Sequence, residues 1–154
     1  MKLLFLCTHN ACRSILAEAI GKKLSGGRIT VKSAGSAPAG RVHPLTLEQL
    51  KKKGFPIEGL SSQSWDELDS YQPDIVITVC DSAAGESCPL WMNKAVKLHW
   101  GLMDPTHLSD DNMSVSEAFE TVMATLEDRM NQLLALDLNQ PMDELKPALQ
   151  ALSS

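Results

Sequence analysis

Close to its first residue the chain reads Lys2-Leu3-Leu4-Phe5-Leu6-Cys7-Thr8-His9-Asn10-Ala11-Cys12-Arg13-Ser14, followed by Ile15-Leu16-Ala17-Glu18-Ala19-Ile20. The apolar run 2–6 predicts a buried strand, and the helical spacing of apolar residues in 15–20 predicts a helix. The loop between them can turn successive backbone N–H groups inward, and the N-terminus of the following helix adds positive potential. We therefore expect residues 8–14 to bind an oxyanion.

Cys7 is the predicted nucleophile of this loop. Arg13 opens the helix and offers a planar set of donors that fits a tetrahedral oxyanion. The same positive field favours a thiolate, and it can lower a cysteine pKa from ~8.5 into the range ~3.5–7.5. We expect Cys7 to be largely ionised at neutral pH. The alternative interpretation is a buried structural cysteine beside a surface arginine.

Length, charge and cysteine content limit the class of protein. The chain has 154 residues with a net charge of −5, which suits one globular domain and argues against binding to nucleic acid. No apolar run approaches the ~20 residues that span a bilayer, so we expect a cytoplasmic monomer without a membrane partner. In that compartment its four cysteines are typical of catalysis or redox chemistry rather than of structural disulfides.

Strands and helices alternate along the rest of the chain. We predict further strands at 28–33, 74–79 and 96–100, helices at 44–53 and 114–136, and a short helical piece at 64–68. This pattern predicts an α/β fold in which helices flank a four-stranded parallel sheet. Residues 1–138 form the predicted domain, and 139–154 form a weakly specified tail that is either a short helix or disordered.

Three candidate catalytic residues follow predicted strands. Cys7 follows the first strand, Cys80 the third and Asp104 the fourth, so we expect all of them at the carboxyl edge of the sheet, where ligands bind in such folds. Asp104 precedes Pro105, which keeps it extended in a loop, and it is a candidate general acid for a leaving oxygen. The alternative is that Asp-Pro only opens a turn.

Cys80 and Cys88 form a second candidate pair. In a continuous helix over 80–88 their Cα atoms would lie about 12 Å apart, whereas a disulfide needs roughly 4.4–6.8 Å. A bond between them therefore requires the segment to unwind, and Gly85 and Ser87 make this easy. The alternative for Cys80 is a small buried apolar residue. The cysteine spacings do not fit a zinc site, so we expect no metal.

The histidines carry less information in the sequence. His43 and His107 lie beside predicted loops and are interpreted as ordinary surface residues. His99 lies in a predicted strand and fits either the core or a position behind the site.

The motifs together resemble those of the thioredoxin-coupled arsenate reductases. The resemblance extends from Lys2 to about Leu136 and rests on the following residues: Cys7 to Ser14, Cys80, Cys88-Pro89, His99-Trp100-Gly101 and Asp104-Pro105. The Cys-x5-Arg-Ser loop is shared with the low-molecular-weight protein tyrosine phosphatases, whereas the later cysteines and the His-Trp-Gly motif are typical of the reductases.

The resemblance implies a relay of three thiols. Cys7 would attack arsenate while the loop amides and Arg13 hold the oxyanion, and Asp104 would protonate the leaving hydroxyl. Cys80 would then attack Cys7 and release arsenite, and Cys88 would attack Cys80. Thioredoxin, or alternatively glutaredoxin, would reduce the resulting disulfide as an external reductant, with no bound cofactor. Phosphate or sulfate would bind as analogues of arsenate.

Several positions depart from the resemblance. His9 stands where the family usually has glycine, and Cys80 and Cys88 are one residue further apart than usual. Some members bind potassium through residues that match Asn10, Glu18 and Ser33 together with an acidic side chain. Gln63 stands at the acidic position, which removes a charge from a hard-cation site, and we expect no metal there.

Two other functions stay open on the sequence alone. A low-molecular-weight protein tyrosine phosphatase needs only Cys7, Arg13 and Asp104, although Thr106 stands where these enzymes usually carry an aromatic residue. Weak phosphatase activity can also accompany the reductase. The third hypothesis is a regulatory module that binds an anion or arsenic through its thiols without catalysis.

Overall fold

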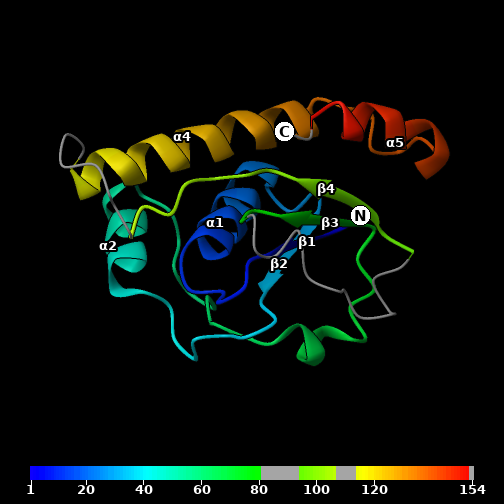
Figure 1. The fold of residues 1–154 in the computed structure, drawn as a ribbon. Helices are drawn as coiled ribbons and strands as arrows, with labels where there is room; N and C mark the ends of the chain where they lie inside the picture. The colour runs from blue at the N-terminus through cyan, green and yellow to red at the C-terminus, as the bar shows by residue number, and fades with distance from the viewer. Residues whose placement is uncertain (81–93, 107–113, 153–154) are drawn as a thin grey trace.

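A parallel β-sheet with helices packed on it forms the computed structural model, which describes residues 1–80, 94–106 and 114–152 (Figure 1). Along the chain the elements are β1 (Lys2–Leu6), α1 (Arg13–Ser25), β2 (Thr30–Ala34), α2 (Pro44–Lys52), the 3₁₀ helix η1 (Trp65–Leu68), β3 (Ile75–Thr78), β4 (Val96–His99), α4 (Val115–Leu134) and α5 (Met142–Gln150). The predicted α/β class and four-stranded parallel sheet are confirmed.

The strand order β2-β1-β3-β4 puts β1 in the interior of the sheet. Leu3 of β1 is paired with Val31 on one side and with Ile75 on the other, and all three strand pairings are parallel. The chain leaves β1 at its carboxyl end and enters α1 seven residues later. Cys7 therefore begins a loop that rises from the middle of the sheet.

Alternate residues of the strands are buried on opposite faces of the sheet. One face shares an apolar cluster with α1, α4 and α5 and contributes Leu3, Phe5, Ile75, Ile77, Val96 and Leu98. The other face packs with η1 and the turn after it, through Leu4, Leu6, Val76, Leu68 and Tyr71. Because both faces are covered, the interior strands β1 and β3 are nearly continuous apolar runs.

Helix α4 lies along α1 in Figure 1, and α5 continues beyond it over the region of β4. The tail predicted as a short helix or disordered thus contains a helix whose Leu145 and Leu149 are fully buried in the main core cluster. None of the helices in the described residues is long and apolar enough to cross a membrane.

The element ends follow local capping chemistry. The Ser114 hydroxyl accepts a hydrogen bond from the Glu117 N–H and begins α4, and Ser64 with Glu67 forms a capping box for η1. The second strand begins at Thr30 rather than at Arg28 as predicted, because the Arg28 N–H closes a turn onto the Ser25 carbonyl. The weak helix considered for 81–87 lies outside the described residues.

Candidate active site

The loop between β1 and α1 turns its carbonyl groups toward the segment 37–43. The Thr8, His9 and Ala11 carbonyls accept hydrogen bonds of 2.9 Å from the N–H groups of Ala37, Ala39 and His43, respectively. The His9 N–H is directed at the Cys7 sulfur. Amides that face the opposite side from their carbonyls are the arrangement expected of an anion-binding loop.

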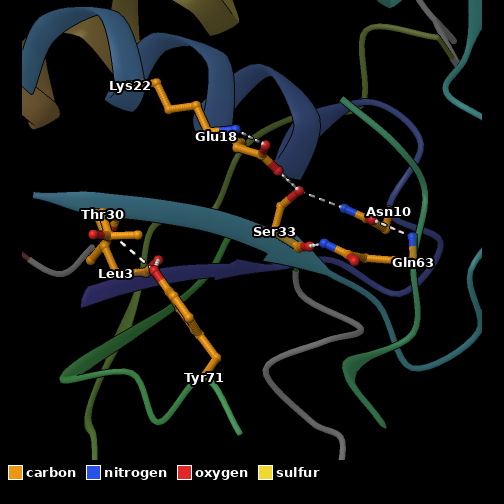
Figure 2. Close-up of polar contacts among 8 residues, drawn as sticks. All are labelled: Leu3, Asn10, Glu18, Lys22, Thr30, Ser33, Gln63 and Tyr71. Carbon is orange, nitrogen blue, oxygen red and sulfur yellow. Dashed lines mark hydrogen bonds and ion pairs between the residues drawn. The ribbon is translucent and has the colours of Figure 1, made fainter. Parts of the chain in front are cut away.

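Asn10 holds this loop in shape. It is fully buried and has a φ of 47°, in the left-handed region that asparagine tolerates better than most residues. Its side-chain amide donates to Ser14 Oγ at 2.7 Å and to Ser33 Oγ at 3.0 Å, and its Oδ1 accepts from the Gln63 N–H at 2.8 Å. Figure 2 shows Asn10 between the strand that carries Ser33 and the segment that carries Gln63.

Glu18 of α1 continues the same network on the other side of Ser33 (Figure 2). Its carboxylate accepts a hydrogen bond from Ser33 Oγ at 2.6 Å and pairs with Lys22 Nζ at 2.6 Å, and the residue is 4% exposed. Gln63 Nε2 donates to the Ser33 carbonyl at 2.9 Å. The residues that match a potassium site are thus bonded to one another, with the Lys22 ammonium beside the buried carboxylate. The expectation of no metal stays a prediction.

Tyr71 ties the interior strand β1 to the edge strand β2 at the other end of the sheet. Its hydroxyl oxygen lies 3.0 Å from the carbonyl oxygens of both Leu3 and Thr30, as Figure 2 shows. This contact joins β1 to β2, from which the loop and Ser33 respectively extend.

Gly35 allows a close approach behind the loop. A Cβ at this position would lie 2.5 Å from the Thr8 carbonyl oxygen and 2.6 Å from the Cys7 carbonyl oxygen. Its N–H donates to the Gln63 carbonyl, and its carbonyl accepts from the Trp65 N–H. A glycine is therefore required where the segment after β2 passes behind the nucleophile, as the run of small residues at 34–40 suggests.

Cys7, Cys12, Arg13 and Asp104 line a pocket of about 190 Å³ at the carboxyl edge of the sheet. His9, Ala11, Ala39, His43 and Thr106 complete its lining. Cys80, which follows β3, lies beside Cys7, because its thiol is the largest influence on the Cys7 pKa and its sulfur lies 3.8 Å from Thr8 Oγ1. The structure thus brings together Cys7, Cys80 and Asp104, which the parallel topology places at one edge.

The two sulfurs change the expected state of Cys7. Contact with the Cys80 side chain raises the pKa of the Cys7 thiol well above its usual range, and burial raises it further. The Arg13 charge and the His9 N–H lower the Cys7 pKa, but by less than Cys80 and burial raise it. The prediction that Cys7 is largely ionised at neutral pH is therefore wrong for the arrangement in which the Cys80 thiol lies against the Cys7 thiol.

Cys12 precedes α1 and is also a free, buried thiol. Burial raises its pKa to about 12, and the Asp104 charge adds to this, whereas a hydrogen bond with Thr46 and the Arg13 charge lower it. A protonated thiol at this depth is a poor nucleophile. Cys7 and Cys12 both line the pocket, and the His9 N–H directed at the Cys7 sulfur distinguishes Cys7 as the candidate nucleophile.

Arg13 connects the loop to the segment after β4. One of its nitrogens donates to the Leu102 carbonyl at 3.1 Å, and another lies 3.6 Å from Asp104 Oδ2. Asp104 Oδ1 accepts hydrogen bonds from the Thr106 N–H at 2.9 Å and from Thr106 Oγ1 at 2.6 Å. The carboxyl group is thus oriented from both sides at the pocket wall that faces Arg13.

His43 and His99 both form hydrogen bonds within the fold. His43 is no ordinary surface residue, because it caps α2 through its Nδ1 and lines the pocket. The signal in the sequence was its place directly before Pro44, since proline at the first helical position marks the preceding residue as the cap. His99 Nδ1 lies 2.8 Å from Thr78 Oγ1 between neighbouring strands. Cys88 and His107 lie outside the described residues.

Comparison with known proteins places this architecture in a family. The low molecular weight phosphotyrosine protein phosphatase family matches residues 2–146. The chain belongs to this family.

Relatives within the low molecular weight phosphatase family include proteins named for arsenate reduction. A glutaredoxin arsenate reductase of Synechocystis is 32% identical over 134 residues, which covers 87% of this chain and 96% of that protein. A solved structure of an arsenate reductase in the phosphate-binding state matches with a TM-score of 0.71 and 32% identity, over 87% of this chain and 96% of the other. A thioredoxin-dependent arsenate reductase of Corynebacterium glutamicum matches with a TM-score of 0.63 and 31% identity, over 82% and 58% of the respective chains.

Proposed function

We propose that this protein is an arsenate reductase that works through a relay of cysteine thiols. The observation that carries the proposal is that the Cys80 thiol lies against Cys7, which lines the oxyanion pocket. Phosphate-ester hydrolysis ends with water and needs no second thiol beside the nucleophile. A disulfide-forming reaction does need one, within reach of the first sulfur.

In the first step the Cys7 thiolate attacks arsenic, and a sulfur–arsenic bond replaces one arsenic–hydroxyl bond. Asp104, in its acid form, gives the leaving hydroxyl its proton so that water departs. The amides of the loop and Arg13 hold the remaining oxygens in a protein environment that is already oriented toward negative charge. Because contact with the Cys80 thiol raises the Cys7 pKa, the thiolate forms when substrate or motion separates the two sulfurs.

In the second step Cys80 attacks the Cys7 sulfur. A Cys7–Cys80 disulfide forms, and the electron pair of the sulfur–arsenic bond stays on arsenic, which leaves as arsenite. Arsenic is thereby reduced by two electrons and the two thiols are oxidised. In the third step Cys88 attacks Cys80, restores the Cys7 thiol, and leaves a Cys80–Cys88 disulfide for an external reductant.

Thioredoxin is the proposed reductant. One relative is named for glutaredoxin and another is described as thioredoxin-dependent. The third cysteine supports thioredoxin, because a dithiol reductant can exchange with a completed intramolecular disulfide. Turnover with arsenate in the presence of thioredoxin and its reductase, compared with turnover with glutathione and glutaredoxin, separates the two.

Trapping the disulfides tests the relay. We expect Cys80→Ser to lose arsenate reduction while retaining any hydrolysis of a chromogenic aryl phosphate. Cys88→Ser should complete about one turnover and stop as a Cys7–Cys80 disulfide, whereas wild-type protein without reductant accumulates Cys80–Cys88. Cys7→Ser is the matched control and should lose both activities. Peptide mapping that finds Cys88 unpaired after arsenate treatment of wild type, with repeated turnover in Cys88→Ser, refutes the relay.

A further inference from the structure

Two histidines line the oxyanion pocket, and the chemistry above gives neither side chain a role. His9 belongs to the anion loop itself, and His43 begins α2. Both line the pocket that also holds Cys7, Arg13 and Asp104. His9 is exposed and His43 is partly exposed, so both residues line the pocket where it is open to solvent.

The backbone sets the tautomer of each neutral ring. His9 Nδ1 lies 3.1 Å from the Ala37 carbonyl oxygen, which can only accept, so Nδ1 carries the proton and Nε2 presents a lone pair. His43 Nδ1 accepts a hydrogen bond of 3.1 Å from the Leu45 N–H, so in this ring Nε2 carries the proton. One pocket is therefore lined by a histidine whose Nε2 is an acceptor and by a histidine whose Nε2 is a donor, and main chain holds the Nδ1 of each ring.

This pair suits an oxyanion that itself carries both acceptors and a hydroxyl group. Arsenate and phosphate dianions keep one hydroxyl at pH 8, whereas sulfate has the same charge and a similar shape but no proton. An imidazole nitrogen that is fixed as an acceptor receives a hydrogen bond from the hydroxyl of arsenate or phosphate. With sulfate, the same nitrogen faces an oxygen that has no proton to donate, so the contact is repulsive. The loop amides, Arg13 and the His43 donor cannot make this distinction, because donors serve both kinds of anion.

We propose that His9 selects protonated oxyanions, arsenate and phosphate, over sulfate, and that His43 binds both kinds equally. The proposal rests on the proposed function in so far as arsenate is the substrate. Glycine, which the resemblance would place at this position, offers no acceptor there. The φ of His9 is not positive, so a side chain is tolerated without backbone strain.

Protection of Cys7 from alkylation measures anion binding without requiring turnover. The full-length reduced protein is treated with iodoacetamide at pH 8 and increasing phosphate or sulfate, at constant ionic strength, and the Cys7 peptide is quantified by mass spectrometry. We expect phosphate to give half-protection at a concentration about 10-fold lower than sulfate, as one hydrogen bond gained and one repulsive contact avoided imply.

Matched variants identify the group responsible. In His9→Ala the phosphate-to-sulfate ratio should fall to near one, mainly because phosphate binds about 10-fold more weakly. His9→Gln keeps an amide donor for Ala37 and an acceptor, and should hold a ratio above that of His9→Ala. His43→Asn retains a capping side chain for α2 and should weaken both anions by a similar factor, so that the ratio is unchanged.

Three results of the protection experiment would contradict the role of His9. Equal protection by phosphate and sulfate in wild type overturns the His9 inference while leaving the oxyanion site intact. A preference that survives in His9→Ala and disappears in Asp104→Asn overturns it as well, because the acceptor is then the carboxylate. If neither anion protects Cys7, the oxyanion site fails and the proposed function fails with it.

Discussion

Asn10→Ala is expected to destabilise the protein by about 4 kcal/mol. The substitution removes three hydrogen bonds, the two buried ones to Ser14 and Ser33 and a partly buried one from Gln63, each worth about 1 kcal/mol. It also places alanine at a φ of 47°, which costs roughly 1 kcal/mol more in the left-handed region. The loss should appear as a lower urea midpoint with an unchanged m value, measured under reducing conditions.

Asn10→Gly separates the two contributions. It loses the same hydrogen bonds but tolerates the positive φ, so it should be about 1 kcal/mol more stable than Asn10→Ala. Both variants should also lose protection of Cys7 by phosphate, because the loop amides are no longer held in one orientation. A loss of stability below about 1 kcal/mol in Asn10→Ala would refute the reasoning, since it would mean that the partners rebond to one another without Asn10.

The remaining predictions concern the pocket. Cys80→Ala should lower the pKa of Cys7, because contact with Cys80 is the largest influence that raises it, and alkylation of Cys7 should then begin at lower pH; an unchanged pH midpoint contradicts this. Asp104→Asn should reduce kcat for arsenate by about 10²–10⁴-fold, with little change in the protection of Cys7 by phosphate. An unaltered kcat would show that Asp104 only opens a turn. Gly35→Ala should displace the loop and weaken the protection of Cys7 by phosphate, because its Cβ would lie 2.5 Å from the Thr8 carbonyl oxygen. Unchanged protection would show that the segment after β2 can move away from the loop.

The order of strands and helices could be predicted from the sequence because it depends on local patterns. Apolar runs and helical spacing mark β1, β3 and α4 within a few residues of their observed ends, and they locate α1, which extends beyond 15–20 to Arg13 and Ser25. Parallel topology then places residues that follow different strands at the same edge, and this general rule sufficed to bring Cys7 and Asp104 to one pocket. It sufficed because it requires only the direction of each strand and no knowledge of individual side-chain contacts.

The state of the site could not be predicted in the same way. The loop motif predicts an ionised Cys7, but the tertiary structure sets Cys80, 73 positions later in the sequence, against it and raises its pKa. The tautomers of His9 and His43 depend on the Ala37 carbonyl and the Leu45 N–H, whose positions follow from how the segment 37–45 packs against the loop. Local sequence determines which groups are present at the edge of the sheet. Packing between distant segments determines their protonation, because hydrogen-bond partners and burial act only over a few ångströms.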